Sequence, residues 1–213
     1  GMTFAAGLRA ILRQDPDVVM VGEIRDGETA QIAVQASLTG HLVLSTVHTN
    51  DAAGAITRLR DMGIEPFLLA SSLRLVVAQR LVRRLCPDCR AVDEAALPLA
   101  RTVMPGFDGP AYRAVGCERC QHTGYAGRTG IHEVIAVDDT IRRLVAEDAG
   151  EDAIARAAFA RGRRLADSAH DCVAAGITTL MFSGVEARPE FQAEFLAPAP
   201  ALPPGSVSEP GFR

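Results

Sequence analysis

The sequence predicts an α/β layer fold with a mainly parallel sheet. Two short apolar segments, residues 17–21 and 41–47, contain several β-branched side chains and have the composition of strands buried on both faces. Segments with helical spacing of apolar residues alternate with these strands along the chain. Such alternation is typical of sheets whose parallel strands are covered by helices.

The first elements of the chain carry start and stop signals. A helix is expected over residues 4–13, and the dipeptide Asp15-Pro16 ends it because proline disfavours a helical conformation in its predecessor. After the first strand, Asp26 is placed to cap a helix over residues 28–38. The second strand follows directly after this helix.

Further helices and one more strand are expected downstream. Asp51 can cap a helix that stops at Gly63, and Pro66 starts a longer helix that runs through Leu81. A short strand is expected over residues 131–137. The helical segments after it form a small subdomain and cover residues 140–147, 152–161 and 165–175.

Size and charge limit the classes of function. With 213 residues, 48% of them hydrophobic, the chain is long enough to bury a core. A net charge of −4 disfavours a protein whose main task is to neutralise the phosphates of a nucleic acid. No apolar run reaches the roughly 18 to 20 residues that a membrane-spanning helix needs, and no signal peptide is recognisable, so a cytoplasmic location is expected.

Four cysteines form two CxxC pairs. The first CxxC motif consists of Cys86 and Cys89, and the second consists of Cys117 and Cys120. Residues 90–116 separate the two motifs. Together the pairs supply the four thiolates of the tetrahedral site that structural zinc prefers. Four protein ligands leave no open coordination position for a substrate, so the predicted Zn²⁺ stabilises the fold and does not catalyse.

Other interpretations of the cysteines fit less well. A redox dithiol needs only one pair, and disulfides do not suit a cytoplasmic chain. A zinc ribbon that binds nucleic acid is the chief alternative, but the segment lacks interleaved basic and aromatic residues. His122 could compete as a ligand, yet four cysteines already close the site, which makes it a surface residue. Cys172, at a helical position, is expected to be a small buried apolar residue.

Two polar residues lie just past the carboxyl ends of predicted strands. Glu23 follows segment 17–21, and His48 follows segment 41–47. Ligands of parallel α/β sheets bind at this end of the strands. Glu23 is either a Walker B acid, which helps to hold hydrated Mg²⁺ or orients the water that attacks a terminal phosphate, or a salt-bridged or capping acid. His41 opens its strand at the opposite end and is expected to be mainly structural.

The order of these elements resembles a known family. A strand ending in Glu23, a second strand ending in His48 and the two cysteine pairs follow one another over about residues 3–179. This combination resembles the type II secretion and type IV pilus assembly ATPases, most closely the secretion protein E family. The resemblance implies a RecA-like motor domain in a homo-hexamer beneath the inner membrane, where ATP hydrolysis drives assembly of a pseudopilus or pilus.

The resemblance also implies roles for individual residues. Glu23 matches the Walker B glutamate and would be the general base or the water-orienting acid. His48 matches a histidine that faces the terminal phosphate, which makes it a nucleotide-binding residue. The implied cofactors of the intact protein are ATP and Mg²⁺, beside the structural Zn²⁺. The implied partners are inner-membrane secretion or pilus platform proteins and no nucleic acid, at a cytoplasmic location peripheral to the inner membrane.

The sequence also departs from the family pattern. It contains no lysine, since all 22 basic residues are arginine, and so it has no phosphate-binding loop of the GxxxxGK[ST] kind. We therefore expect the C-terminal portion of the motor, a fragment that is inactive by itself. A hypothesis from a different class is a nonenzymatic zinc-containing adaptor that binds a membrane partner through its helices.

The expected organisation has four parts. A partial RecA-like P-loop ATPase core is followed by a tetracysteine zinc insert, by a strand with the C-terminal helical subdomain, and by a disordered proline-rich tail. These parts cover residues 1–85, 86–127, 128–184 and 185–213.

Overall fold

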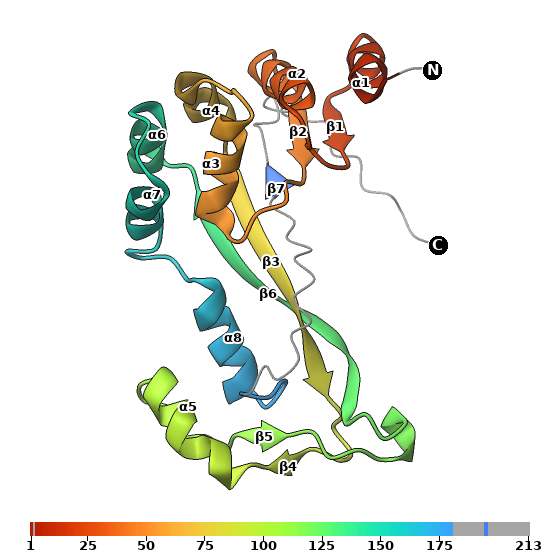
Figure 1. The fold of residues 1–213 in the computed structure, drawn as a ribbon, viewed down its shortest axis with the longest axis vertical. Coiled ribbons are helices and arrows are strands. Elements are labelled where there is room, and N and C mark those ends of the chain that lie inside the picture. The colour runs from red at the N-terminus through yellow and green to blue at the C-terminus, as the bar shows by residue number, and fades with distance from the viewer. Residues whose placement is uncertain (2, 181–193, 196–213) are drawn as a thin grey trace, which may run out of the picture.

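The N-terminal part alternates helices and strands, as the sequence predicts. The computed structural model describes residues 1, 3–180 and 194–195 (Figure 1). β1 and β2 pair in parallel and in step, so their carboxyl ends lie side by side. The elements of this part are α1 (Phe4–Leu12), β1 (Val18–Val21), α2 (Gly27–Leu38), β2 (Leu42–Ser45) and α3 (Ala52–Asp61).

Aspartates begin the two helices that follow β1 and β2. The Asp26 carboxylate accepts a hydrogen bond from the backbone N–H of Thr29 at 2.8 Å, and Asp51 accepts one from Gly54 at 2.7 Å. A short acceptor side chain satisfies an N–H group that the first helical turn leaves unpaired. Both predicted caps are confirmed.

A long antiparallel ribbon connects this part to the opposite end of the molecule. β3 (Leu75–Leu85) pairs with β6 (Tyr125–Ala136) over almost its whole length, as Figure 1 shows. β7 (Glu194–Phe195) pairs antiparallel with β3. The prediction of a mainly parallel sheet is therefore wrong: among the strands that the structure describes, parallel pairing is confined to β1 and β2.

The prediction of one long helix from Pro66 to Leu81 is also wrong. α4 covers only Pro66–Ser72, Leu73 is extended, and β3 follows. The spacing of apolar residues in the segment after Leu73 does not distinguish a buried helix from a strand. The β-branched pair Val76-Val77, however, favours a strand. The deciding partner is β6, which lies far along the sequence. The strand predicted over residues 131–137 exists as the end of this longer β6.

The segment between β3 and β6 carries the cysteines and several short elements. β4 and β5 pair antiparallel there, beside the helix α5, at the far end of the ribbon (Figure 1). The elements are β4 (Ala91–Val92), η1 (Glu94–Ala96), α5 (Leu97–Val103), β5 (Tyr112–Arg113) and η2 (Glu118–Cys120).

The three predicted C-terminal helices are present but pack in different places. They are α6 (Asp139–Ala146), α7 (Glu151–Ala158) and α8 (Leu165–Ala174). α6 and α7 add Ile141 and Ile154 to the main core, whereas α8 packs Ala169 against Val82 and Ile131 of the ribbon. The predicted disordered tail, residues 185–213, lies outside the described residues apart from 194–195.

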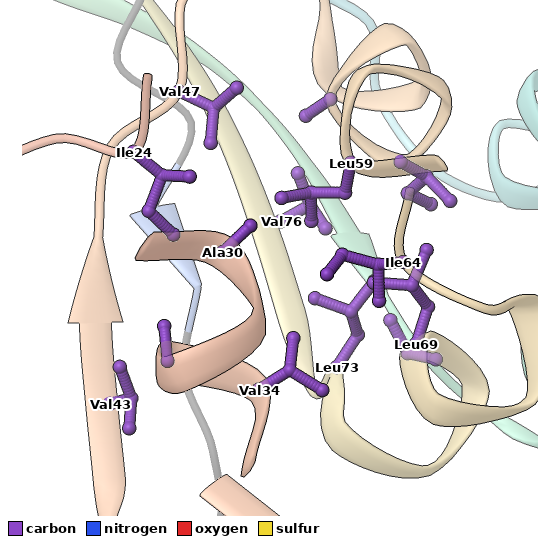
Figure 2. Packing of buried hydrophobic residues seen from close by; sticks show 14 of the residues in the cluster. Ile24, Ala30, Val34, Val43, Val47, Leu59, Ile64, Leu69, Leu73 and Val76 are labelled. Carbon is purple, nitrogen blue, oxygen red and sulfur yellow. The ribbon is translucent and has the colours of Figure 1, made fainter. Parts of the chain in front are cut away.

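The main core lies between α2, α3, α4 and the ribbon. Figure 2 shows side chains of these elements converging, among them Val34, Leu59, Leu69 and Val76. Leu69 and Val76 are fully buried. None of the helices in the described part combines the length and the apolar character required to span a bilayer.

Truncation of a core leucine tests this packing. We expect Leu69→Ala to lower the free energy of unfolding by about 2–5 kcal/mol, because it removes buried methyl groups and leaves a cavity. Urea denaturation followed by circular dichroism measures the change. The matched control is Leu81→Ala, because Leu81 is 59% exposed, and it should stay within about 0.5 kcal/mol of wild type. Equal losses in the two variants would contradict the described core.

Candidate functional site

Glu23 and His48 meet beyond the carboxyl ends of β1 and β2. Two hydrogen bonds join the segments after the strands: Ile24 N–H donates to Thr46 O at 2.9 Å, and Thr46 Oγ1 donates to Gly22 O at 2.7 Å. These bonds keep the segments side by side where the strand pairing ends. His48 Nε2 consequently lies 3.1 Å from Glu23 Oε2, so the structure brings the two predicted site residues together.

Arg25 completes a group of three polar side chains. Its Nε donates to Glu23 Oε2 at 2.7 Å, which leaves this oxygen shared between the guanidinium and the imidazole. A bond from His48 to a carboxylate requires a proton on Nε2 of the ring. All three side chains remain open to solvent, with exposed fractions of 37% for Glu23, 54% for His48 and 70% for Arg25. The group is therefore accessible to a polar ligand.

The electrostatics of this group keep the acid ionised. The hydrogen bond from Arg25 is the largest cause that holds the pKa of the Glu23 carboxyl below its ordinary value. Burial opposes it and comes second, and the bond from His48 adds a smaller lowering of the same pKa. Glu23 is thus a carboxylate near neutral pH. It can orient water or a hydrated cation, but a lowered pKa makes it a weaker proton acceptor.

His41 lies at the opposite end of β2, away from His48. Its Nδ1 is 3.0 Å from the carbonyl oxygen of Ala36, near the end of α2. This contact joins the start of the strand to the end of the preceding helix, and it places His41 outside the group formed by Glu23 and Arg25.

The four cysteines of the CxxC pairs converge at the far end of the ribbon. All four sulfur atoms lie within 4.8 Å of one another, with Cys86 and Cys117 3.9 Å apart, and Cys89 and Cys120 3.8 Å apart. Tetrahedral zinc with Zn–S bonds of about 2.3 Å separates its sulfur ligands by about 3.8 Å. The sulfur positions thus fit one such ion, and all four thiols are free rather than joined in disulfides.

Backbone turns around two glycines direct N–H groups at these sulfur atoms. Gly116 N–H donates to Cys89 Sγ at 3.3 Å, and Gly124 N–H donates to Cys120 Sγ at 3.2 Å. Gly116 has a φ of +113°, and a Cβ atom there would lie 2.7 Å from the carbonyl oxygen of His122. A larger residue would therefore displace the turn that forms the cluster.

The thiols of the cluster differ in their acidity. Burial is the largest single effect on the Cys120 thiol and raises its pKa. The backbone N–H groups of Cys117 and Gly124, together with the neighbouring thiols of Cys117 and Cys89, outweigh burial and lower the pKa to about 6. Burial raises the pKa of Cys89 to about 12, with the neighbouring thiols adding to the effect. A divalent cation would favour thiolates at every position, because coordination deprotonates the sulfur outright.

Neither His122 nor Cys172 belongs to this cluster. Among the described residues, only the four cysteines of the CxxC pairs lie close enough together to share one metal ion. Cys172 packs against the small apolar cluster between α8 and the ribbon, as predicted, but it is only partly buried and not fully buried as expected. The cysteine cluster is well separated from the tips of β1 and β2, which lie at the other end of the ribbon (Figure 1).

Comparison with known proteins identifies the family. A family model described as "Type II/IV secretion system protein" matches residues 1–192. The chain belongs to this family. The resemblance inferred from Glu23, His48 and the cysteine pairs is thereby confirmed.

Close relatives of this secretion system protein are curated components of type II secretion. The chain is 66% identical over 159 residues to type II secretion system protein E of Aeromonas hydrophila, covering 73% of this chain and 31% of that protein. It is 61% identical over 181 residues to type II secretion system ATPase E of Vibrio cholerae, covering 84% of this chain and 36% of that protein. The chain therefore spans about a third of the length of these relatives.

Two solved structures share the fold of this chain. The pilus retraction motor PilT, solved with bound ADP, matches with a TM-score of 0.57 and 27% identity, over 84% of this chain and 41% of that one. The ATPase DotB of Legionella pneumophila matches with a TM-score of 0.59 and 22% identity, over 84% of this chain and 40% of that one. The second likeness concerns the fold alone. The predicted α/β fold of an ATPase is confirmed at this level.

Sequence reasoning missed one buried acid of this secretion system protein. Glu133 lies on β6, is 5% exposed, and accepts hydrogen bonds from the first residues of α3 and α8. The available signal was an acidic residue inside an otherwise alternating apolar strand. Its two partners lie far away in the sequence and could not be named from it.

The pairing of Arg25 with Glu23 can be tested by titration. We expect Arg25→Ala to raise the pKa of Glu23 toward its ordinary value, because Arg25 is the main cause of the lowered pKa. NMR titration of the Glu23 side-chain carbon measures this change. The control is Arg9→Ala, which removes an exposed arginine that pairs with Glu28 at 2.9 Å and should leave Glu23 unchanged. An unaltered pKa in Arg25→Ala would refute the described pairing.

Proposed function

We propose that this chain is part of a motor ATPase that drives type II secretion pseudopilus or type IV pilus assembly. The observation that carries the proposal is the contact of Glu23 with His48 at the adjoining tips of two parallel strands, where ligands of such sheets bind. Membership of the secretion family and the likeness to a motor solved with ADP support a nucleotide as the ligand.

In the proposed site Glu23 orients the attacking water or holds hydrated Mg²⁺. Its lowered pKa favours this role over that of a proton acceptor. His48 would donate its ring N–H to a phosphate oxygen, which would replace Glu23 Oε2 as the acceptor of this hydrogen bond. ATP, when bound, would supply the phosphoryl group, and Mg²⁺ would neutralise part of its negative charge.

We infer that the chain alone hydrolyses ATP negligibly. Since it has no lysine, it has no GxxxxGK[ST] loop to hold the β- and γ-phosphates, and another part of a longer protein must supply one. Apolar side chains exposed on β1, Val18 at 53% and Met20 at 74%, offer a surface for that part. Hexamer formation, a cytoplasmic place beside the inner membrane and contacts with membrane platform proteins belong to the same proposal.

We propose that the cysteine cluster holds one structural Zn²⁺. The sulfur separations and the N–H donors that stabilise thiolates support this assignment. With four protein ligands the ion has no position for substrate. Its proposed role is to hold together the two cysteine-bearing turns at the far end of the ribbon.

The hydrolysis proposal is tested in a longer protein that includes a phosphate-binding loop. We expect Glu23→Gln to lower kcat for phosphate release by about 10²–10⁴-fold, because the amide lacks the charge that orients water or cation. The control Glu28→Gln changes an exposed acid on α2 and should leave kcat unchanged. Full activity in Glu23→Gln would refute the assignment, and a wild-type protein without ATPase activity would favour the adaptor hypothesis.

The zinc proposal is tested on the chain itself. Elemental analysis should find about one zinc per chain, and a strong chelator should lower the unfolding temperature, because binding of a structural metal stabilises the folded state. We expect Cys117→Ser to lose the metal. Cys172→Ser is the matched control, since it removes a cysteine outside the cluster and should retain the metal. Zinc retained by Cys117→Ser at the wild-type level would refute the assignment.

A further inference from the structure

Glu133 is the one charged side chain among the buried residues that the structure describes. It lies on β6 with 5% of its surface exposed. A buried carboxylate is costly unless hydrogen bonds compensate for its lost hydration. Its environment is therefore expected to contain specific donors.

The donors come from the starts of two helices. The backbone N–H of Ala52, the first residue of α3, donates to Glu133 Oε1 at 2.8 Å. The backbone N–H of Leu165, the first residue of α8, donates to Glu133 Oε2 at 3.1 Å. Such N–H groups have no partner within their own helix, and the helix dipole favours a negative charge beside them. One carboxylate thus joins two helices that are remote in sequence.

The α3 side of this contact leads to His48. The loop of residues 48–51 connects His48 to Ala52, and within it Thr49 Oγ1 donates to the carbonyl oxygen of Asp51 at 2.9 Å. Its other end is held by the bond from Thr46 Oγ1 to Gly22 O. Glu133 therefore fixes one of the two ends of the short loop that presents His48.

The α8 side leads toward the cysteine cluster. α8 packs Ala169 on the ribbon, and just beyond the helix the carbonyl oxygen of Ile177 accepts a hydrogen bond from Leu85 at 2.7 Å. Leu85 directly precedes Cys86. A continuous set of contacts thus extends along α8 from Glu133 to the far end of the ribbon.

We propose that Glu133 is a positioning residue: its carboxylate ties the His48 loop to α8 and holds His48 against Glu23. The catalytic consequence rests on the proposed function, but the structural linkage does not. When the carboxylate is lost, the start of α3 and the start of α8 are no longer joined, and the His48 loop loses one of its fixed ends.

The linkage is measured by NMR on the chain itself. In the wild-type background, Glu23→Gln should shift the His48 ring resonances, because it replaces the carboxylate that faces Nε2. In the Glu133→Gln background, the shift of the His48 ring resonances caused by Glu23→Gln should be less than about half of that in the wild-type background, because the contact between His48 and Glu23 is weaker. A merely structural role would lower stability without abolishing this coupling in the folded chain. The control is Glu65→Gln, an acid at the start of α4 whose side chain caps nothing.

A second variant removes one donor and leaves Glu133 intact. Leu165→Pro lacks the N–H that reaches Oε2, while proline is well accommodated at the first position of a helix and the preceding Arg164 is already extended. Leu165→Ala loses the same side chain but keeps the N–H. We expect the His48 response to shrink in Leu165→Pro relative to Leu165→Ala, and this pair decides the question if Glu133→Gln does not fold.

In the longer protein, Glu133→Gln should lower kcat by about 10-fold or more, with KM for ATP changed little, because a displaced group affects the reacting geometry more than binding. An undiminished His48 response in folded Glu133→Gln overturns the inference, as does an unchanged kcat in a protein that hydrolyses ATP. A wild-type longer protein without ATPase activity would instead refute the proposed function, and the NMR result would still decide the linkage.

Discussion

The antiparallel ladder between β3 and β6 is the interaction on which the rest of the structure depends. One end of it contributes Val76 and Ile135 to the main core, and the other end leads directly into Cys86. α8 packs along its middle. Beyond the short pairing with β7 the ladder has only two strands, and a two-stranded ribbon has little independent stability in water. The core at one end, α8 along its length and the proposed zinc site at the other end together compensate for this weakness.

Acidic residues organise the part of the molecule around the carboxyl ends of β1 and β2. Asp26 and Asp51 cap α2 and α3, Glu133 accepts from the starts of α3 and α8, and Glu23 pairs with Arg25. Three of these acids are occupied by backbone N–H groups. Glu23 alone among them faces only side chains that remain open to solvent, which is the property that a ligand-binding acid needs. The difference between these acids is their partner and not their residue type.

The two candidate sites depend on different kinds of constraint. At the strand tips, the parallel pairing of β1 and β2 determines where Glu23 and His48 lie, and both side chains are partly exposed to solvent. At the cysteine cluster the turns at Gly116 and Gly124 determine the sulfur positions locally. The first site can therefore respond to movements of neighbouring elements. The second depends on these local turns and should respond little to such movements.

The sequence by itself determined the local features: the helix caps Asp26 and Asp51, the two parallel strands, the cysteine pairs and the family. Each of these depends on residues that are close in the chain or on a short pattern. The sequence could not determine that residues 75–81 form a strand, because the partner that satisfies their backbone lies in β6.

Only the tertiary structure decided how distant groups meet. It placed His48 beside Glu23, and it made Glu133 a bridge between α3 and α8. The physical reason is common to these cases. Hydrogen bonds and burial between remote segments depend on the whole fold, whereas caps, turns and metal-binding pairs depend on neighbours in the chain.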